Sequence, residues 1–327
     1  MKLFKIVGFA LAALSCVHFA EAQQAAKLTA VVQTPGAKPG VLTLERSDGE
    51  GTFFYMPKGT DQLMQARASA CGMFVIQTPA DMAKALRDYY GGDYADARKG
   101  FAAVKKKYAH LAGLPGSPGT MAALYELVCA ARMLDIPAVK TLSASIPGEK
   151  VLNPVEKGQV EAAKVLALVD DTPESFAAIQ KAVVALAKTA GVRLDSEAYG
   201  WTRYALGRAA AATMAVANDK TKSANAAIDF YCQAAMSMHG AQKTVPADAI
   251  KRAMNLLWNL PDVQAYASKA PKPMEKKEWF KAPANFRDAV AMAHYYKTVY
   301  ETGTPDPLAT QLDAYYYNQL KGVKKGD

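Results

Sequence analysis

Tyr89-Tyr90-Gly91-Gly92-Asp93-Tyr94-Ala95-Asp96-Ala97-Arg98-Lys99-Gly100-Phe101 is the stretch that decides the fold of this 327-residue chain. Residues 91–93 end one helix, because glycine adopts left-handed backbone angles that other residues resist. Tyr94 is placed to wedge between this helix and the next, and Ala97 permits their close approach. Phe101 and Val104 follow at helical spacing and are expected to fill the shared core. The stretch predicts two helices joined by a tight turn.

The spacing of this hairpin resembles that of a tetratricopeptide repeat. The residues that match the family pattern are Gly92, Tyr94, Ala97, Phe101 and Val104. A second, partial match comprises Trp201, Tyr204, Ala205, Ala227, Tyr231 and Ala234. Because such hairpins cannot bury their apolar face alone, the resemblance implies a mainly α fold, in which helical hairpins stack into a solenoid. An unrelated α-helical domain with one chance match is the alternative.

The first 22 residues have the pattern of a secretory signal peptide. Lys2 and Lys5 precede an apolar run over residues 6–13, and Ala20-Glu21-Ala22 forms a small-x-small cleavage site. We expect cleavage after Ala22 and a periplasmic or secreted mature protein. A membrane anchor and a lipid on Cys16 are the alternatives, but the apolar run is short and the residues before Cys16 fit a lipoprotein signal poorly. No later segment reaches the roughly 18 apolar residues of a spanning helix.

Three cysteines, Cys71, Cys129 and Cys232, follow the cleavage site. An odd number leaves at least one thiol free or bonded to another molecule in an oxidising compartment. Their spacings are too long for a zinc site or a thioredoxin-like pair. We expect buried, inert thiols, because Cys129 and Cys232 lie in apolar helical patterns. One disulfide among the three remains an alternative.

The chain carries 39 basic and 30 acidic residues, a formal net charge of +9. The lysines are spread along the sequence, with dense clusters only at residues 105–107 and 324–325. In an exported protein this charge suits an anionic envelope surface at least as well as a nucleic acid. Solvated helix faces explain it more simply, so we expect no nucleic-acid partner.

Residues 23–78 are expected to form a small β-rich N-terminal module. Runs of β-branched and aromatic residues at 41–46 and 52–56 flank turn residues and predict a hairpin, and residues 72–76 predict a further strand. A lone hairpin is marginal in water, so we expect three or four strands. Nothing in this segment gathers into a site, which favours a module that caps the helices over one that binds a peptide.

From Pro79 onward the pattern is helical. The expected helices cover residues 80–91, 94–108, 119–134, 136–146, 154–170, 195–217, 223–239, 284–302 and 308–320, with others beginning near residues 174 and 246. We assign residues 79–260 to a helical repeat domain and residues 261–327 to C-terminal helices that continue the stack. Pro271-Lys272-Pro273 marks a break that is expected to be a loop rather than a domain boundary.

The chain offers few candidates for catalysis. His110, His239 and His294 stand far apart and have no second ligand at metal spacing. Glu174 before Ser175 resembles the catalytic phrase of lytic transglycosylases, but the Gly-Leu-Met-Gln-like segment of that family is missing. A capped helix start at residues 171–174 explains these acids more simply. We expect no enzymatic activity and no cofactor.

Aromatic and basic residues on two expected helices suggest a binding surface. The candidate partner-binding residues are Tyr89, Tyr90, Arg203, Tyr204 and Arg208. The resemblance places both helices at the first-helix position of a repeat, where family members line a concave groove. Tyrosine and arginine are also typical of binding hot spots. Helix packing is the competing explanation for each aromatic side chain, Trp201 included.

Together these patterns predict an exported, non-catalytic scaffold or adaptor that binds a peptide or protein of the cell envelope through a concave helical groove. Two alternatives remain open. A peptidoglycan-acting enzyme requires converging catalytic residues. A periplasmic carrier of a small anionic ligand requires a closed, basic pocket.

Overall fold

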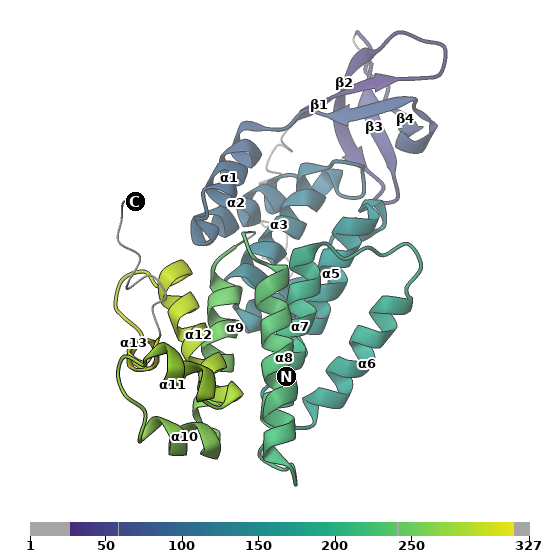
Figure 1. Ribbon diagram of the computed structural model, residues 1–327. Coiled ribbons are helices and arrows are strands. Elements are labelled where there is room, and N and C mark those ends of the chain that lie inside the picture. Colours follow the sequence, from purple (N-terminus) through teal and green to yellow (C-terminus); the bar gives the residue numbers. More distant parts are fainter. Residues whose placement is uncertain (1–26, 58, 241, 317–327) are drawn as a thin grey trace, which may run out of the picture.

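The computed structural model describes residues 27–57, 59–240 and 242–316 (Figure 1). These residues form thirteen α-helices, three short 3-10 turns and one five-stranded antiparallel sheet. The mainly helical fold and the N-terminal β module are therefore confirmed. The leader and the segment after Tyr316 lie outside the described residues.

The sheet contains β1 Leu28–Gln33, β2 Gly40–Ser47, β3 Thr52–Met56, β4 Met64–Arg67 and β5 Met73–Ile76. Its strand order is β4-β3-β2-β1-β5, and every neighbouring pair is antiparallel. The predicted hairpin is β2–β3, and the further predicted strand is β5. The prediction of three or four strands is wrong, because β1 and β4 also join the sheet.

Alternation along the strands gives the sheet one buried face. Leu28, Ala30 and Val32 of β1 are buried, whereas Val31 between them is exposed. Phe53 of β3 is completely buried. The turn between β2 and β3 rests on the helical part, where an added Cβ on Gly113 would come 2.2 Å from the carbonyl oxygen of Gly49. Gly113 requires glycine for this reason and for its positive φ, and the positive φ of Gly49 also favours glycine.

The helices follow in chain order. They are α1 Ala80–Tyr90, α2 Tyr94–Lys107, α3 Pro118–Arg132, α4 Ile136–Ser143, α5 Pro154–Leu166, α6 Ser175–Lys188, α7 Ser196–Thr213, α8 Lys220–Ser237, α9 Thr244–Trp258, α10 Pro261–Ala267, α11 Lys276–Lys281, α12 Ala284–Val299 and α13 Pro307–Asp313. Carboxylate or amide side chains cap the first turn of α2, α4, α5, α7, α8 and α13. Each cap satisfies a backbone N–H that lacks a partner within its helix.

The predicted hairpin of α1 and α2 is present. Gly92 has a φ of +86°, and the Asp93 side chain accepts a hydrogen bond from Asp96 N at 3.2 Å. Ala97 and Phe101 are completely buried, as expected for the shared core. An unpredicted close approach occurs one turn further along α2, where a Cβ on Gly100 would lie 3.0 Å from Ala85 Cβ.

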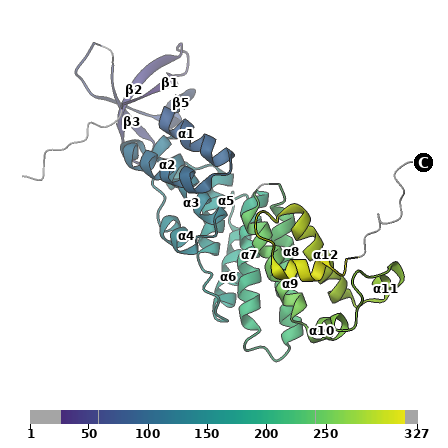
Figure 2. The ribbon, with the colours of Figure 1, turned by 90° about the vertical axis from the view of Figure 1, so that its left-hand side faces the viewer.

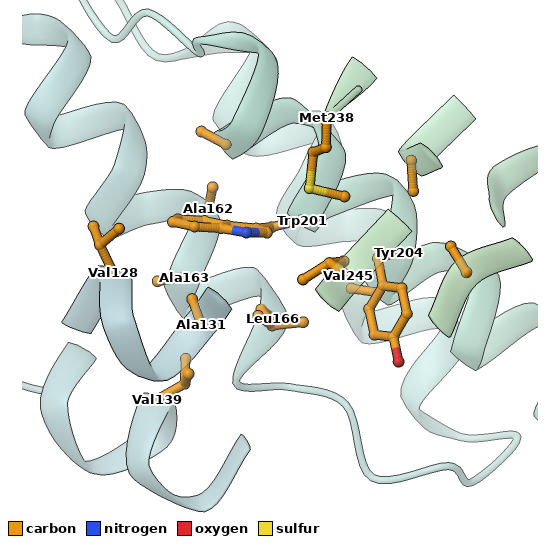
Figure 3. Close-up of a cluster of buried hydrophobic side chains, with 14 of the residues drawn as sticks. Val128, Ala131, Val139, Ala162, Ala163, Leu166, Trp201, Tyr204, Met238 and Val245 are labelled. Atoms are coloured by element: carbon orange, nitrogen blue, oxygen red, sulfur yellow. The ribbon is translucent and has the colours of Figure 1, made fainter. Parts of the chain in front are cut away.

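Successive helices pack on one another, so the core runs along an elongated molecule (Figure 2). The sheet lies at one end and α10–α13 at the other. Figure 3 shows buried side chains of α3, α4, α5, α7 and α9 in one cluster with Trp201, which is completely buried. Trp201 is therefore a core residue rather than a surface one.

The sequence and the structure differ in three further places. The segment around residues 261–281 contains the short helices α10 and α11, which were not predicted. Helix α13 ends at Asp313 rather than at Leu320. Glu174 is exposed and makes no capping hydrogen bond to α6, and in the turn before it Asp170 accepts a hydrogen bond from Thr172 N.

Among the described residues Cys71, Cys129 and Cys232 are free thiols. Burial raises the pKa of each of these thiols. No helix in the described part of the chain is both long and apolar enough to span a membrane.

Candidate binding site

A cavity of about 520 Å³ opens where the first helical hairpin meets α3 and the start of α5. We call it the tyrosine pocket. Its lining residues are Tyr89, Tyr90, Tyr94, Met121, Leu124, Tyr125, Arg132, Asn153, Val155, Glu156 and Gln159. Four of them are tyrosines, and only two, Arg132 and Glu156, carry a formal charge.

The tyrosine rings form one connected cluster centred on Tyr89. Its ring centroid lies 5.2 Å from that of Tyr90, 5.9 Å from that of Tyr94 and 5.1 Å from that of Tyr125. All three contacts are edge-on, the arrangement that aromatic quadrupoles favour. Tyr89 is buried, whereas Tyr90 is 75% exposed. The buried ring thus supports an exposed one that is available to a ligand.

Arg132 is held at the base of the pocket by Glu197 of α7. Its Nε and Nη2 donate to the two carboxylate oxygens at 2.7 and 2.8 Å. Its Nη1 donates to the Tyr94 hydroxyl at 3.2 Å, and the guanidinium carbon lies 4.3 Å from the Tyr89 ring centroid. Burial disfavours the charged guanidinium, but the hydrogen bonds and charge of Glu197 outweigh burial and raise the pKa of Arg132. Arg132 therefore carries its positive charge, and the carboxylate of Glu197 balances that charge.

The opposite wall is the first turn of α5. The Asn153 side chain accepts hydrogen bonds from Val155 N and Glu156 N, while Glu156 Oε2 accepts one from Asn153 N at 2.8 Å. This reciprocal capping box fixes both side chains. Gln159, one turn further, donates to Asp195 Oδ2 at 2.8 Å. The wall is consequently rigid, and its polar groups come from a helix rather than from a loop.

The charges around the tyrosine pocket favour a cation. Glu197 balances Arg132, which leaves Glu156 as the charged lining group without an opposite lining charge. Tyrosine faces also attract cations through their π electrons. The pocket therefore combines exposed aromatic area with a negative rim.

The tyrosine hydroxyls are poor candidates for proton transfer. Burial, followed by the charge and hydrogen bond of Tyr90, raises the pKa of Tyr125 to about 12. Burial also raises the pKa of Tyr89. Both groups are neutral at physiological pH, so they can bind but not act as bases. In the described ranges no three histidine, cysteine or acidic side chains gather as metal ligands.

The structure brings together only two of the five residues singled out by the sequence. Tyr89 and Tyr90 line the tyrosine pocket, whereas Arg203, Tyr204 and Arg208 are absent from its lining. Glu197, which touches the pocket through Arg132, precedes Arg208 by about three turns of α7. Arg203, Tyr204 and Arg208 contact other residues of the protein instead, so the five side chains do not form one lining.

The other three residues have partners within the protein. Tyr204 is buried, and its hydroxyl donates to the Asp248 carboxylate. Arg208 donates from Nε to Asp171 Oδ1 at 2.8 Å and from Nη2 to Asp171 Oδ2. The guanidinium carbon of Arg203 lies 4.4 Å from the ring centroid of Tyr199. Tyr204 thus belongs to the core, and both arginines are engaged on the surface of α7.

Sequence reasoning missed Tyr125, Arg132 and Glu156. Tyr125 lies on the helix after the recognised hairpin, and α3 is apolar and buried at nearly every position, so its sequence does not mark one residue as a site. The capping sequence of residues 153–156 was also readable. Arg132 offered no local signal, because its partner is 65 residues away.

Comparisons of the chain with protein-family models, with curated proteins and with solved structures find no match. The proposed function therefore rests on the contacts, burial and charges of the chain's own residues.

Proposed function

We propose that this protein is an exported, non-catalytic adaptor that binds an extended segment of a partner protein of the cell envelope. In this proposal a lysine or arginine side chain of the partner enters the tyrosine pocket, stacks on Tyr90 and pairs with Glu156. The helices form a tetratricopeptide-like stack that presents the pocket. The leader sequence supports export, and the hairpin spacing supports the repeat assignment.

One observation carries the choice of a basic side chain: Arg132, the cation of the pocket, is already paired with Glu197 through two hydrogen bonds. An arginine in this state has little charge left for a partner's carboxylate. The exposed ring of Tyr90 and the carboxylate of Glu156 remain, and both favour a cation. Because the positive charge of Arg132 is already paired, a carrier of small anionic ligands is disfavoured.

The raised pKa values of Tyr89 and Tyr125 support a binding role over a catalytic one. A peptidoglycan-acting enzyme would need an ionisable acid and base that converge on a substrate. Glu156 is the one carboxylate among the described lining residues, so no second acidic group stands beside it in the lining.

The proposal can be tested with a panel of short peptides that differ only in a central lysine, arginine, glutamate, phenylalanine or alanine. Calorimetry should detect binding of the lysine and arginine peptides and weaker or no binding of the others. Tyr90→Ala should weaken binding about five- to tenfold, the worth of one cation–π contact of about 1 kcal/mol. Glu156→Gln should also weaken binding of the basic peptides. This loss of affinity should be smaller at high salt, because salt screens the attraction between the carboxylate and the peptide.

Tyr90→Phe is the matched control, because it keeps the aromatic face and removes only the hydroxyl. It should bind nearly as well as the wild-type protein. Preferential binding of the glutamate peptide, or an unchanged affinity in Tyr90→Ala, would contradict the proposal.

A further inference from the structure

A second hollow, of about 660 Å³, lies far along the stack from the tyrosine pocket, between α8 and α12. We call it the apolar groove. Its lining residues are Cys232, Ala235, Met236, His239, Ile250, Asp288, Ala291, Met292 and Tyr295. Both α8 and α12 pack on α9, which supplies Ile250 between them. The groove therefore lies over α9, between α8 and α12.

The walls of the apolar groove expose apolar side chains to water. Met236 of α8 is 78% exposed, and Tyr295 of α12 is 37% exposed. Small residues, Ala235 and Ala291, leave room between the larger ones. Exposed apolar area of this kind within a concavity is typical of a surface that binds another chain. Methionine adapts its shape to such a contact.

The charges near the groove are mainly acidic. Asp288 lies in its lining, and Asp229 lies one turn before Cys232 on α8. Burial, with added contributions from both carboxylates, raises the pKa of the Cys232 thiol to about 11. His239 accompanies Tyr295, with 3.0 Å between its Nδ1 and the tyrosine hydroxyl. An occupant with basic residues beside apolar ones is thus favoured.

The described chain ends against α12, one of the two helices that border this groove. The Tyr316 ring stacks on His294 of α12, with 3.7 Å between the ring centroids, and Tyr295 of the groove is the next residue along α12. Eleven residues, 317–327, follow in the sequence. When extended they can span up to about 35 Å, whereas a helix is only about 10–12 Å thick. The segment is long enough to pass around α12.

The composition of residues 317–327 matches the apolar groove. Leu320 and Val323 supply branched apolar side chains three residues apart, and lysines stand at 321, 324 and 325. The three positive charges are complementary to Asp288 of the lining and to Asp229 near Cys232 on α8. Burial of the leucine and valine side chains favours docking, and the entropy of ordering the segment opposes it.

We propose that residues 317–327 of this chain occupy the apolar groove, with Leu320 and Val323 against its apolar walls and the lysines near Asp229 and Asp288. The segment then covers Met236 and Met292 within the same molecule. An envelope partner that needs this surface has to displace it. This inference does not depend on the tyrosine pocket.

A disulfide between the two elements tests the proposal directly. In the full chain with Cys16→Ser and Cys71→Ser, Leu320→Cys should form an intramolecular disulfide with Cys232 under mild oxidation, located by mass spectrometry of the peptides. Gly326→Cys is the matched control, because it has the same tether but no proposed contact. Leu320→Cys should react about tenfold faster than Gly326→Cys. Changing Lys321, Lys324 and Lys325 to glutamate should slow the reaction.

Thiol labelling gives a second, independent measurement. Removal of residues 317–327 should make Cys232 react about tenfold faster with a maleimide, whereas Tyr90→Ala should leave its rate unchanged. Equal disulfide rates at positions 320 and 326 would overturn the proposal, since they indicate a tether without a docking site. Disulfide-linked dimers would also overturn it and would assign the groove to a second copy of the chain. An unchanged labelling rate would exclude the segment from the groove.

Discussion

Arg132 of α3 and Glu197 of α7 form a two-pronged ion pair across 65 residues of sequence, and both side chains are largely buried. This pair links the end of α3 to the first turn of α7. It also determines which charge the tyrosine pocket presents, because it removes the positive charge of Arg132 from the reach of a ligand.

Glu197→Gln should therefore destabilise the protein. Breaking a buried ion pair leaves an uncompensated charge, which costs about 3–5 kcal/mol. The double variant Arg132→Met, Glu197→Leu should lose much less, because it removes both charges. Urea denaturation of the wild-type protein and the two variants measures the difference. A single variant as stable as the wild-type protein would show that the pair is not formed.

Two helical glycines should differ in their tolerance of alanine. A Cβ on Gly158 would lie 2.0 Å from the backbone oxygen of Arg193. A backbone atom cannot relieve this clash by a change of side-chain rotamer. A Cβ on Gly200 would meet only the flexible side chain of Met238. Gly158→Ala should cost at least about 1–3 kcal/mol, and Gly200→Ala distinctly less. Melting temperatures of both variants provide the test, and equal shifts would contradict this packing.

Tyr204→Phe should affect stability but not peptide binding. It removes the hydroxyl that donates to Asp248, a loss of about 1 kcal/mol. Its affinity for the lysine peptide should match that of the wild-type protein, because Tyr204 is remote from the tyrosine pocket. A weaker affinity with unchanged stability would indicate that Tyr204 takes part in peptide binding.

The stability supplied by Asp306 should depend on pH. Burial would raise the pKa of this carboxyl, but the hydrogen bond of Lys251 and the Ala309 N–H outweigh burial and lower the pKa below its ordinary value of 3.8. Since the folded-state pKa is lower, the contribution is present above pH 3.8 and is lost as the pH falls through the folded-state value. The difference in unfolding free energy between wild type and Asp306→Asn should shrink in acid. A constant difference would contradict the linkage.

Protein isolated from its native cells should begin at Gln23. The basic, apolar and small-residue segments of the leader predict this cleavage. Intact-mass measurement checks it. A species that retains Met1, or one lipidated at Cys16, would disprove the prediction.

The local part of the fold was readable from the sequence. The turn at Gly92 and the cap at Asp93 define the first hairpin, and Asp195 marks the start of α7, because each signal lies within a few residues of its effect. Strand β4 was missed, because Met64–Arg67 is only four residues long and mostly exposed. It belongs to the sheet only through its pairing with β3.

The candidate site was less predictable than the fold. Tyr89 and Tyr90 could be found because they flank the turn of the hairpin. Arg208 pairs with Asp171, which lies in a loop 37 residues earlier in the sequence. Helical spacing alone cannot predict such a distant pair. The same limit applies to Arg132. Charge at a binding site is set by long-range pairs, and single-sequence patterns report only near neighbours.

The placement of Trp201 makes the protein's own fluorescence selective. The chain has three tryptophans, Trp201, Trp258 and Trp279, and all lie in helices α7, α9 and α11. Trp201 is completely shielded from water, so its emission should shift to longer wavelength when the middle of the stack opens. The β-sheet contains no tryptophan and stays silent in that signal. Emission and sheet-sensitive circular dichroism, followed through one denaturant titration, therefore report separately on the helical part and on the sheet.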